Sequence, residues 1–543
     1  MTKDEIVKAL KSISKLEEIN LEFPENGDFG DYSTNIALKN KDLNPQEIAD
    51  KINSQDLPFT AKVVGRFINF FLKTDALVSN LMQIAEEKEK YGTSDIGKDK
   101  TVIIDYSAPN IAKPFGIGHL RSTIVGQALY NTYKSLGYTV VGDNHLGDWG
   151  TQFGKLLYMI DSTKTDDLSI ENLEKLYVEF HKLAAENPKL EESAREWFKK
   201  LEEGDKEARE IWQKCIDISL KEFNRVYDLL GVKIDFAFGE SYYEGEMKQM
   251  MADPKLKKYL EKGEDGAIII DLTKEGIKTP LMFLKKDGAT TYATRDLATI
   301  EFRVRKWDPE IIIYEVGAEQ SLHFQQLFAA ARLLGLVDKK VELVHTAHGL
   351  YLAPDGKKFS TRKGKTIKLD EVLVEAIDRA KKLGSEDEKT AKMVGIGAIK
   401  YFDLMHSVQS NVVFDWEKIM NMEGNSGPYL QYTVARCNSV LAKSKESVSS
   451  KQSTVNSLNS EELSVLRTLN QFSEVIESAA KSYSPNLLCN YLFDLASKYN
   501  AFYNKNRVLE SDNEAFRLKL TFATGQVLKN GLKLLGIETP ERM

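Results

Sequence analysis

The sequence is poor in cysteine, with three residues of this type among 543. Cys215, Cys437 and Cys489 are far apart, lie in apolar segments of helical pattern and form no CxxC pair. This spacing excludes a disulfide framework and the usual zinc-binding motifs. We therefore interpret the three cysteines as buried packing residues and expect no tightly bound metal.

Long hydrophobic runs are also missing. No stretch reaches the roughly 18 apolar residues that a membrane-spanning helix needs. The first residues, MTKDE, lack the apolar core of a signal peptide. We therefore expect a cytoplasmic protein without a membrane segment.

The chain has no excess of basic residues, because 74 lysines and arginines stand against 81 aspartates and glutamates, giving a net charge of −7. Such a chain has no overall attraction to nucleic acid, so a polyanionic partner would have to bind local basic patches. A length of 543 residues is too great for one hydrophobic core and predicts about two to four domains.

The strongest chemical pattern is a strand, a loop and a helix in succession. Residues 101–105 form a short β-branched run typical of a buried strand, and residues 119–136 repeat apolar side chains at helical spacing. This order places the free N–H groups of a helix start beside the carboxyl end of a parallel strand, where open α/β sheets bind nucleotides. Gly118 lets a phosphate approach the backbone, and His119 and Lys113 can contact it, so the loop suits a triphosphate.

The patterns on either side predict three domains. Residues 1–95 form a small α+β domain with a strand or hairpin arm at residues 62–72 and a Gly- and Ser-bearing linker at its end. Residues 96–420 form an α/β domain with a helical insertion at about residues 155–265 and a Lys-rich loop at residues 357–365. Residues 421–543 are expected to be all helical. In the α/β domain, later strands of the parallel sheet are expected at residues 267–272, 290–296, 311–317 and 341–345.

Six stretches together resemble a known family. Residues 116–119 (GIGH) and 358–362 (KFSTR) are similar to the HIGH and KMSKS signatures of class I aminoacyl-tRNA synthetases in variant form. Four further stretches resemble arginyl-tRNA synthetases in particular: residues 108–114, 144–152, 292–297 and 427–432. The likeness covers essentially the whole chain from the loop near Asp28 onward, in the order and spacing of the family.

The resemblance implies a Rossmann-like parallel-sheet catalytic domain with a helical insertion, an N-terminal α+β domain that contacts the tRNA elbow, and a C-terminal all-α helical bundle that binds the anticodon. The implied reaction joins L-arginine to ATP as arginyl-adenylate and then transfers arginine to the 3′ end of tRNA(Arg). Mg²⁺ would accompany ATP as part of the substrate complex. A cytoplasmic monomer is expected.

Attack of a carboxylate on the α-phosphate concentrates negative charge on phosphoryl oxygens, so the site needs fixed donors and positive charge. The expected catalytic residues are His119, Lys113, Lys358 and Arg362. The expected ATP contacts are Gly116, Gly118, His119, Phe359, Ser360 and Lys363. The alternatives are a helix-capping role for His119 and a solvated charged turn at residues 357–365, but the pairing of the two segments favours phosphate binding.

A guanidinium is planar, permanently charged and offers five donors, so its pocket needs carboxylates. The resemblance points to Asp296, Tyr292 and Glu240 around the guanidinium of arginine. It also points to Asn110, Asn144 and Gln320 at the α-amino and carboxylate end, and Asp105 and His119 are counted in the same pocket. The alternatives are a helix N-cap for Asp296 and a strand residue in the core for Tyr292.

The anticodon contacts implied by the resemblance are Tyr429, Gln431, Tyr432 and Arg436, whose rings, amide and cation suit stacking and edge hydrogen bonds with bases. Aromatic residues at helical spacing often pack in a core, so the alternative is that about half of these four residues serve packing instead. Three positions depart from the family pattern: Ala108 replaces a common serine, Gly116 a histidine and Thr361 a lysine. Lys113 is the nearest candidate to replace the missing lysine charge.

Two other functions fit parts of this pattern. One is a small-molecule nucleotidyl transferase of the same superfamily. The predicted N- and C-terminal domains argue against this function. The other is a tRNA-binding relative without catalysis, which the altered signatures would allow.

Overall fold

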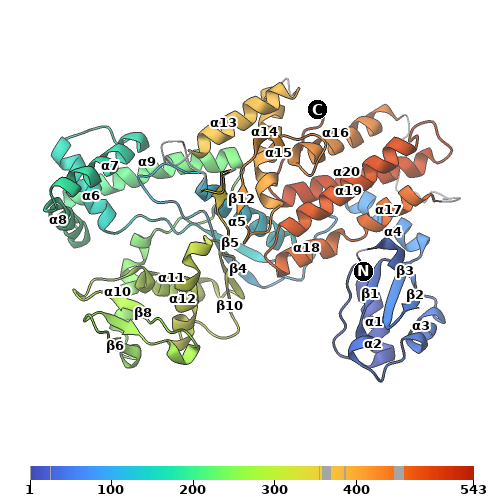
Figure 1. The fold of residues 1–543 in the computed structure, drawn as a ribbon, viewed down its shortest axis with the longest axis horizontal. Helices are drawn as coiled ribbons and strands as arrows, with labels where there is room; N and C mark the ends of the chain where they lie inside the picture. Colours follow the sequence, from blue (N-terminus) through green and yellow to red (C-terminus); the bar gives the residue numbers. More distant parts are fainter. Residues whose placement is uncertain (1, 25, 354, 358–367, 385–386, 445–457) are drawn as a thin grey trace.

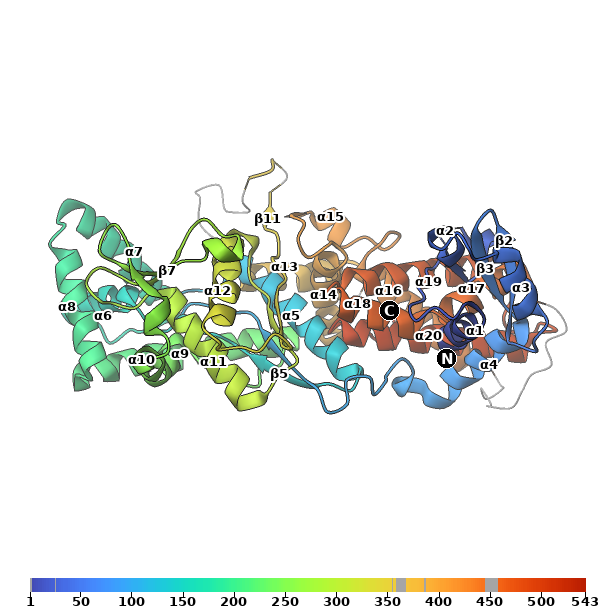
Figure 2. The same ribbon diagram turned by 90° about the horizontal axis from the view of Figure 1, so that it is seen from below.

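The computed structural model describes residues 2–24, 26–353, 355–357, 368–384, 387–444 and 458–543. Figures 1 and 2 show an elongated molecule with a helical arm at one end, a parallel sheet near the middle, and a helical bundle with a small separate sheet at the other end. In the described part of the chain, none of the helices combines the length and apolar character needed to cross a membrane. The three cysteines are buried and unpaired, as the sequence predicts.

The central sheet has four parallel strands in the order β10-β9-β4-β5. Apolar β-branched residues fill β4 and β9, which are buried as expected for strands covered by helices on both faces. The crossover helices and strands alternate along the chain, and this confirms the predicted α/β class. The elements are β4 (Thr101–Asp105), α5 (Gly118–Ser135), β5 (Thr139–Asp143), α11 (Tyr292–Trp307), β9 (Ile311–Tyr314), α12 (Ser321–Leu333) and β10 (Glu342–His345).

The segment between β5 and α11 is a helical arm followed by a second, antiparallel sheet. Its helices are α6 (Thr151–Thr163), α7 (Ile170–Glu186), α8 (Leu190–Glu203), α9 (Lys206–Leu230) and α10 (Glu244–Ala252). The antiparallel sheet has the order β6-β7-β8, formed by β6 (Leu260–Lys262), β7 (Ile268–Ile270) and β8 (Leu281–Leu284). The long α9 runs back from the arm to the central sheet (Figure 1).

Two expected strands of the parallel sheet are absent from it. Residues 268–270 pair antiparallel with β6 and β8, so the apolar run at residues 267–272 belongs to a different sheet. Residues 292–296 begin a helix, because Thr291 and Thr294 form a reciprocal capping box at its start. The prediction of parallel strands at both places is therefore wrong.

The N-terminal region is an α+β unit with an antiparallel sheet of order β1-β3-β2. The predicted strand or hairpin arm is a hairpin that turns at Gly65, whose φ of 61° lies in the left-handed region that glycine favours. The elements are α1 (Thr2–Ser14), β1 (Tyr32–Thr34), α2 (Ile36–Lys39), α3 (Pro45–Asn53), β2 (Phe59–Val64), β3 (Phe67–Leu72) and α4 (Thr74–Glu87).

After the central sheet the chain is almost entirely helical. Its only strands among the described residues are the short parallel pair β11 (Tyr351–Leu352) and β12 (Val412–Val413). The helices are α13 (Leu369–Lys382), α14 (Glu388–Leu404), α15 (Trp416–Ile419), α16 (Gly427–Lys443), α17 (Ser460–Leu469), α18 (Phe472–Lys481), α19 (Asn486–Lys505) and α20 (Glu514–Leu534).

The N-terminal unit packs on this helical bundle, at the far end from the helical arm (Figure 2). The ring of Tyr91 stacks on Phe472 of α18 with centroids 6.0 Å apart. Lys3 forms a 3.2 Å ion pair with Glu474. The N-terminal unit is thus held on α18 of the bundle.

A buried ionic triad joins α11 to the sheet. Arg303 donates to Asp105 at 2.7 Å and to Asp143 at 2.7 Å, the last residues of β4 and β5. All three side chains are buried, and burial raises the pKa of Asp143 against the opposing charge of Arg303. The guanidinium of Arg303 therefore compensates the charge of both buried carboxylates.

We predict that Arg303→Met lowers the free energy of unfolding by about 3–5 kcal/mol, because two carboxylates stay buried without a partner. Urea unfolding followed by circular dichroism measures this loss. The matched control is Arg305→Met on the same helix, whose 2.7 Å pair with Glu246 is exposed and should contribute at most about 1 kcal/mol. Equal losses in the two variants would contradict a central role for the triad.

Candidate functional site

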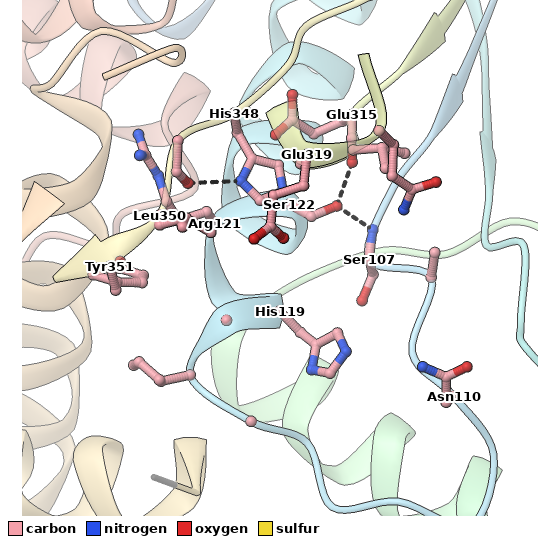
Figure 3. Close-up of a pocket in the computed structure, with 18 residues that line it drawn as sticks. Ser107, Asn110, His119, Arg121, Ser122, Glu315, Glu319, His348, Leu350 and Tyr351 are labelled. Carbon is pink, nitrogen blue, oxygen red and sulfur yellow. Dashed lines mark hydrogen bonds between the residues drawn. The ribbon is translucent and has the colours of Figure 1, made fainter. Parts of the chain in front are cut away.

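A cavity of about 720 Å³ lies at the carboxyl ends of β4 and β9. The chain leaves β4 toward β5 on one side, whereas β9 lies on the other side, so the sheet order opens a crevice at this point. The walls are the loop after β4, the first turn of α5, the segment after β9 and residues 348–351. Figure 3 shows His119, Ser107 and Asn110 around this space. The structure brings five predicted residues to it: Asn110, Gly116, Gly118, His119 and Gln320.

His119 lies in the first turn of α5 and extends toward the cavity (Figure 3). Burial lowers the pKa of its imidazole, so the ring is neutral at pH 7 and has one N–H to donate. Its Nδ1 has no hydrogen-bond partner among the described residues. A Cβ placed on the neighbouring Gly118 would meet no atom within 4 Å. The start of α5 therefore offers a free donor and open backbone to an anion.

The loop after β4 has a strained backbone. Three of its residues have positive φ although none is glycine: Ser107 at 75°, Ala108 at 43° and Ala112 at 60°. Each such conformation costs about 1–3 kcal/mol and persists only when the surroundings enforce it. The backbone N–H of Ser107 donates to Ser122 of α5, and that of Ala108 donates to the Asn144 side chain, both at 2.9 Å. Asn144 is thus occupied in holding the loop and does not line the cavity.

Helix α9 of the arm supplies the remaining supports of the loop. The Tyr227 hydroxyl lies 2.8 Å from the Ser107 hydroxyl and accepts from Asn144 at 3.0 Å. The Ser219 hydroxyl accepts from the N–H of Ala112 at 2.9 Å. The sequence analysis assigned no site residue to α9, although Ser219 and Tyr227 are eight positions apart and share one helix face with apolar Phe223 between them.

The predicted guanidinium pocket contains an ionised carboxylate. Asp296 of α11 makes a 2.7 Å hydrogen bond with His323 of α12, and His145 lies 3.7 Å from its other oxygen. Burial favours the protonated acid, but the hydrogen bond and the nearby positive charges outweigh it and lower the pKa of Asp296. None of Asp296, Glu240 and Tyr292 lines the cavity; the connection is through His323, which follows the cavity-lining Gln320 by three residues.

The second predicted carboxylate already has a partner. Glu240 lies 3.1 Å from Arg295, whose guanidinium is 5.0 Å from the centre of the Tyr292 ring. Burial raises the pKa of Glu240 to about 7, against the opposing effect of Arg295. Tyr292 is 64% exposed at the start of α11, so its alternative as a core strand residue is wrong. The alternative for Asp296 as a helix N-cap is also wrong, because Thr291 holds that position.

Other predicted residues lie apart from the cavity. Asp105 belongs to the buried triad with Arg303 and does not line the cavity, so its place in the arginine pocket is not supported. The Lys113 ammonium lies 5.0 Å from the centre of the Tyr177 ring of α7, and burial lowers its pKa. Five predicted residues lie outside the described part of the chain: Lys358, Phe359, Ser360, Arg362 and Lys363. Where the described chain resumes at Lys368, it lies against the loop after β4, because the N–H of Leu369 donates to the carbonyl of Phe115 at 2.9 Å.

The predicted anticodon residues divide into exposed and buried members. Tyr432 is 36% exposed, and the Arg436 guanidinium lies 4.9 Å from its ring centre. Tyr429 is half-buried and accepts a hydrogen bond from Asn500. Gln431 is fully buried and donates to the carbonyls of Met393 and Glu538, so the prediction that it contacts tRNA is wrong.

No group of three His, Cys, Asp or Glu side chains in the described part of the chain is placed to hold a metal ion.

Comparison with known families places matches along the whole chain. The model described as "tRNA synthetases class I (R), catalytic domain" matches residues 80–416. The model described as "DALR anticodon binding domain" matches residues 430–543, and that described as "Arginyl tRNA synthetase N terminal domain" matches residues 1–72.

Individual relatives agree with these models. The chain is 40% identical over 555 residues to an arginine–tRNA ligase of Clostridioides difficile, covering 98% of this chain and 97% of that one. It is 42% identical over 510 residues to an arginine–tRNA ligase of Exiguobacterium sibiricum, covering 92% and 90%. Among solved structures, the arginyl-tRNA synthetase of Plasmodium falciparum superposes with a TM-score of 0.84 at 27% identity, covering 100% and 99%. That of Thermus thermophilus has the same fold, with a TM-score of 0.84 at 24% identity, covering 99% of each chain.

We predict that Tyr227→Phe loosens the loop after β4 without unfolding the protein. The variant loses two hydrogen bonds of about 0.5–1.5 kcal/mol each, so amide exchange of residues 107–112 should accelerate about 10-fold or more. Hydrogen–deuterium exchange with mass spectrometry measures this. Tyr243→Phe is the matched control, since the buried Tyr243 hydroxyl has no partner among the described residues. Unchanged exchange in Tyr227→Phe would refute the supporting role of α9.

Proposed function

The chain belongs to the class I arginyl-tRNA synthetases, and from this membership we propose that it activates L-arginine with ATP and transfers the arginyl group to the 3′ end of tRNA(Arg). The observation that carries the proposal is the buried carboxylate of Asp296, kept ionised by His323, which lies three residues from the cavity-lining Gln320. Matches to both flanking family models favour this function over a small-molecule nucleotidyl transferase.

We place the ATP phosphates at the loop after β4 and the start of α5. An arginine carboxylate oxygen attacks the α-phosphorus, the bond to the bridging oxygen of the β-phosphate breaks, and pyrophosphate leaves. Negative charge grows on the phosphoryl oxygens during this step. Neutral His119 and the open backbone at Gly118 provide fixed donors there. Lys113 is on the same loop, and its side chain would have to leave the ring of Tyr177 to bring its positive charge to the phosphates. Mg²⁺ enters as part of the ATP substrate complex, with no protein ligand assigned.

We place the substrate guanidinium at Asp296 and the exposed ring of Tyr292. The guanidinium of Arg295 neutralises Glu240, which leaves Asp296 as the carboxylate whose charge the substrate can match. Asn110 and Gln320 line the cavity and suit the α-amino and carboxylate end of arginine. This arrangement orients the substrate carboxylate toward the ATP phosphates.

We assign tRNA contacts to the N-terminal unit and to Tyr429, Tyr432 and Arg436 of α16. An exposed ring with a guanidinium over it suits a stacked, unpaired base. We also propose that the chain divides into three domains, residues 1–95, 96–420 and 421–543. We further propose that the protein is a monomer located in the cytoplasm.

The test of the function is a charging assay with bulk tRNA and each amino acid in turn. Arginine should be the one amino acid that is attached to tRNA, in an ATP-dependent reaction that releases pyrophosphate. Charging with a different amino acid, or binding of tRNA without any charging, would overturn the proposal.

We predict that Asp296→Asn weakens selection of arginine by about 2–5 kcal/mol in kcat/KM, since it removes a charge facing a guanidinium while keeping the size of the side chain. Steady-state charging over a range of arginine concentrations measures this. Asp308→Asn at the exposed end of the same helix is the control and should behave as wild type. An unchanged kcat/KM in Asp296→Asn would contradict the pocket.

We predict that Lys113→Met slows adenylate formation by ~10²–10³, the scale of removing one preorganised donor in the transition state, with little change in the KM for arginine. Single-turnover formation of arginyl-adenylate in the presence of tRNA measures the rate. The control is Lys62→Met in the N-terminal unit, because Lys62 also lies over an aromatic ring, at 4.9 Å from the centre of Phe71. A fast Lys113→Met enzyme would show that Lys113 does not replace the missing lysine charge.

A further inference from the structure

Lys400 of α14 is a buried cation that joins three parts of the chain. Its side chain is 1% exposed, and its ammonium donates to the carbonyl of Leu230 at 2.7 Å and to the carbonyl of Gly536. Leu230 is the last residue of α9, and Gly536 follows the end of α20 by two residues. In the described part of the chain, Lys400 forms no ion pair with a carboxylate.

The acceptors of the Lys400 ammonium are instead backbone carbonyls at or just after the ends of two helices. The last carbonyls of a helix lack partners within the helix and carry a partial negative charge. The carboxyl ends of α9 and α20 therefore converge on one ammonium. Burial lowers the pKa of Lys400 to about 8, so the group is mostly protonated at pH 7. Lys400→Met removes the cost of burying an ammonium but leaves the carbonyls of Leu230 and Gly536 without this donor, so its two effects on stability oppose each other.

The contact at Leu230 lies less than one helical turn from Tyr227. Tyr227 holds Ser107 and Asn144, and Ser219 on the same face holds Ala112. These are the contacts that keep the loop after β4 in its left-handed conformation. A shift of the carboxyl end of α9 would therefore displace the supports of the loop directly.

We propose that Lys400 is a positioning residue for adenylate formation, which acts by fixing the carboxyl end of α9 and, through Tyr227, the loop after β4. The inference rests on the proposed function. Gly536 lies within the region that matches an anticodon binding domain, so the same ammonium ties the geometry of the nucleotide loop to the docking of the C-terminal segment.

The test is a cycle of Lys400→Met, Tyr227→Phe and the double variant, with single-turnover formation of arginyl-adenylate from ATP and arginine in the presence of tRNA. Lys400→Met should slow this step about 10- to 100-fold, the scale of a small displacement far from the reacting atoms, in a protein that still melts cooperatively above the assay temperature. The double variant should be no slower than the slower single variant, because both changes act through one contact. Effects that multiply would overturn the inference.

The matched control is Tyr401→Phe, one residue further along α14. The Tyr401 hydroxyl donates to the Cys489 carbonyl of α19 at 2.9 Å, so this variant also loses a buried contact with the C-terminal helices but none with α9. It should form adenylate at the wild-type rate. A loss as large as that of Lys400→Met would show that general loosening of the bundle, and not α9, is the cause.

A second variant keeps the lysine and disturbs the contact from the opposite side. A Cβ on Gly536 would lie 2.9 Å from the Lys400 ammonium, and its φ of 69° disfavours alanine. Gly536→Ala should slow adenylate formation several-fold. Combined with Tyr227→Phe, its effect should again not multiply. This variant replaces Lys400→Met in the test if Lys400→Met does not fold. Wild-type protein that forms no arginyl-adenylate would overturn the proposed function together with this inference. An active wild type with multiplying variant effects would overturn this inference alone.

Discussion

The strained loop after β4 is the constraint on which the other parts of the site depend. The order of the sheet opens a crevice between β4 and β9, and the chain must cross its mouth before α5 begins. It does so with positive φ at three residues that are not glycine. The cost of these conformations is offset by hydrogen bonds from three separate elements: α5, the end of β5 and α9. The helical arm interrupts the sheet in sequence, yet in space it completes the loop.

Helix α14 connects these supports to the rest of the molecule. Arg121 of α5 forms a buried 3.1 Å pair with Asp403 of α14, three residues after Lys400, which holds α9. One helix thus fixes both the helix that follows the loop and the helix that braces it. Because α14 also packs against the C-terminal bundle through Tyr401, the position of the bundle and the geometry of the cavity are not independent.

The sequence predicts those features that depend on neighbouring residues. The strand, loop and helix at residues 101–136 and the helices of the arm follow from local periodicity. The prediction of a strand at residues 290–296 was wrong because this seven-residue pattern suits a strand until the capping box at Thr291 is considered. Local patterns could not predict which distant side chains form hydrogen bonds or ion pairs with each other. Asn144 and Tyr227 are 83 positions apart, and Arg121 and Asp403 are 282 apart, so no local pattern distinguishes a side chain that faces substrate from one that holds the loop.

Different effects set the protonation states of His119 and Asp296. His119 is kept neutral by burial, and its Nδ1 has no hydrogen-bond partner among the described residues, so in the proposed function it offers the nucleotide a donor without added charge. Asp296 is kept ionised by His323 and His145 despite burial. Glu240 differs from both, because burial brings its pKa to about 7 even with Arg295 beside it. As pH falls below this value, Glu240 takes up a proton and Arg295 loses the negative charge that opposes its own. In the proposed function, the charge that varies near neutral pH therefore lies on the amino-acid side of the site, whereas the donors proposed for the nucleotide do not change.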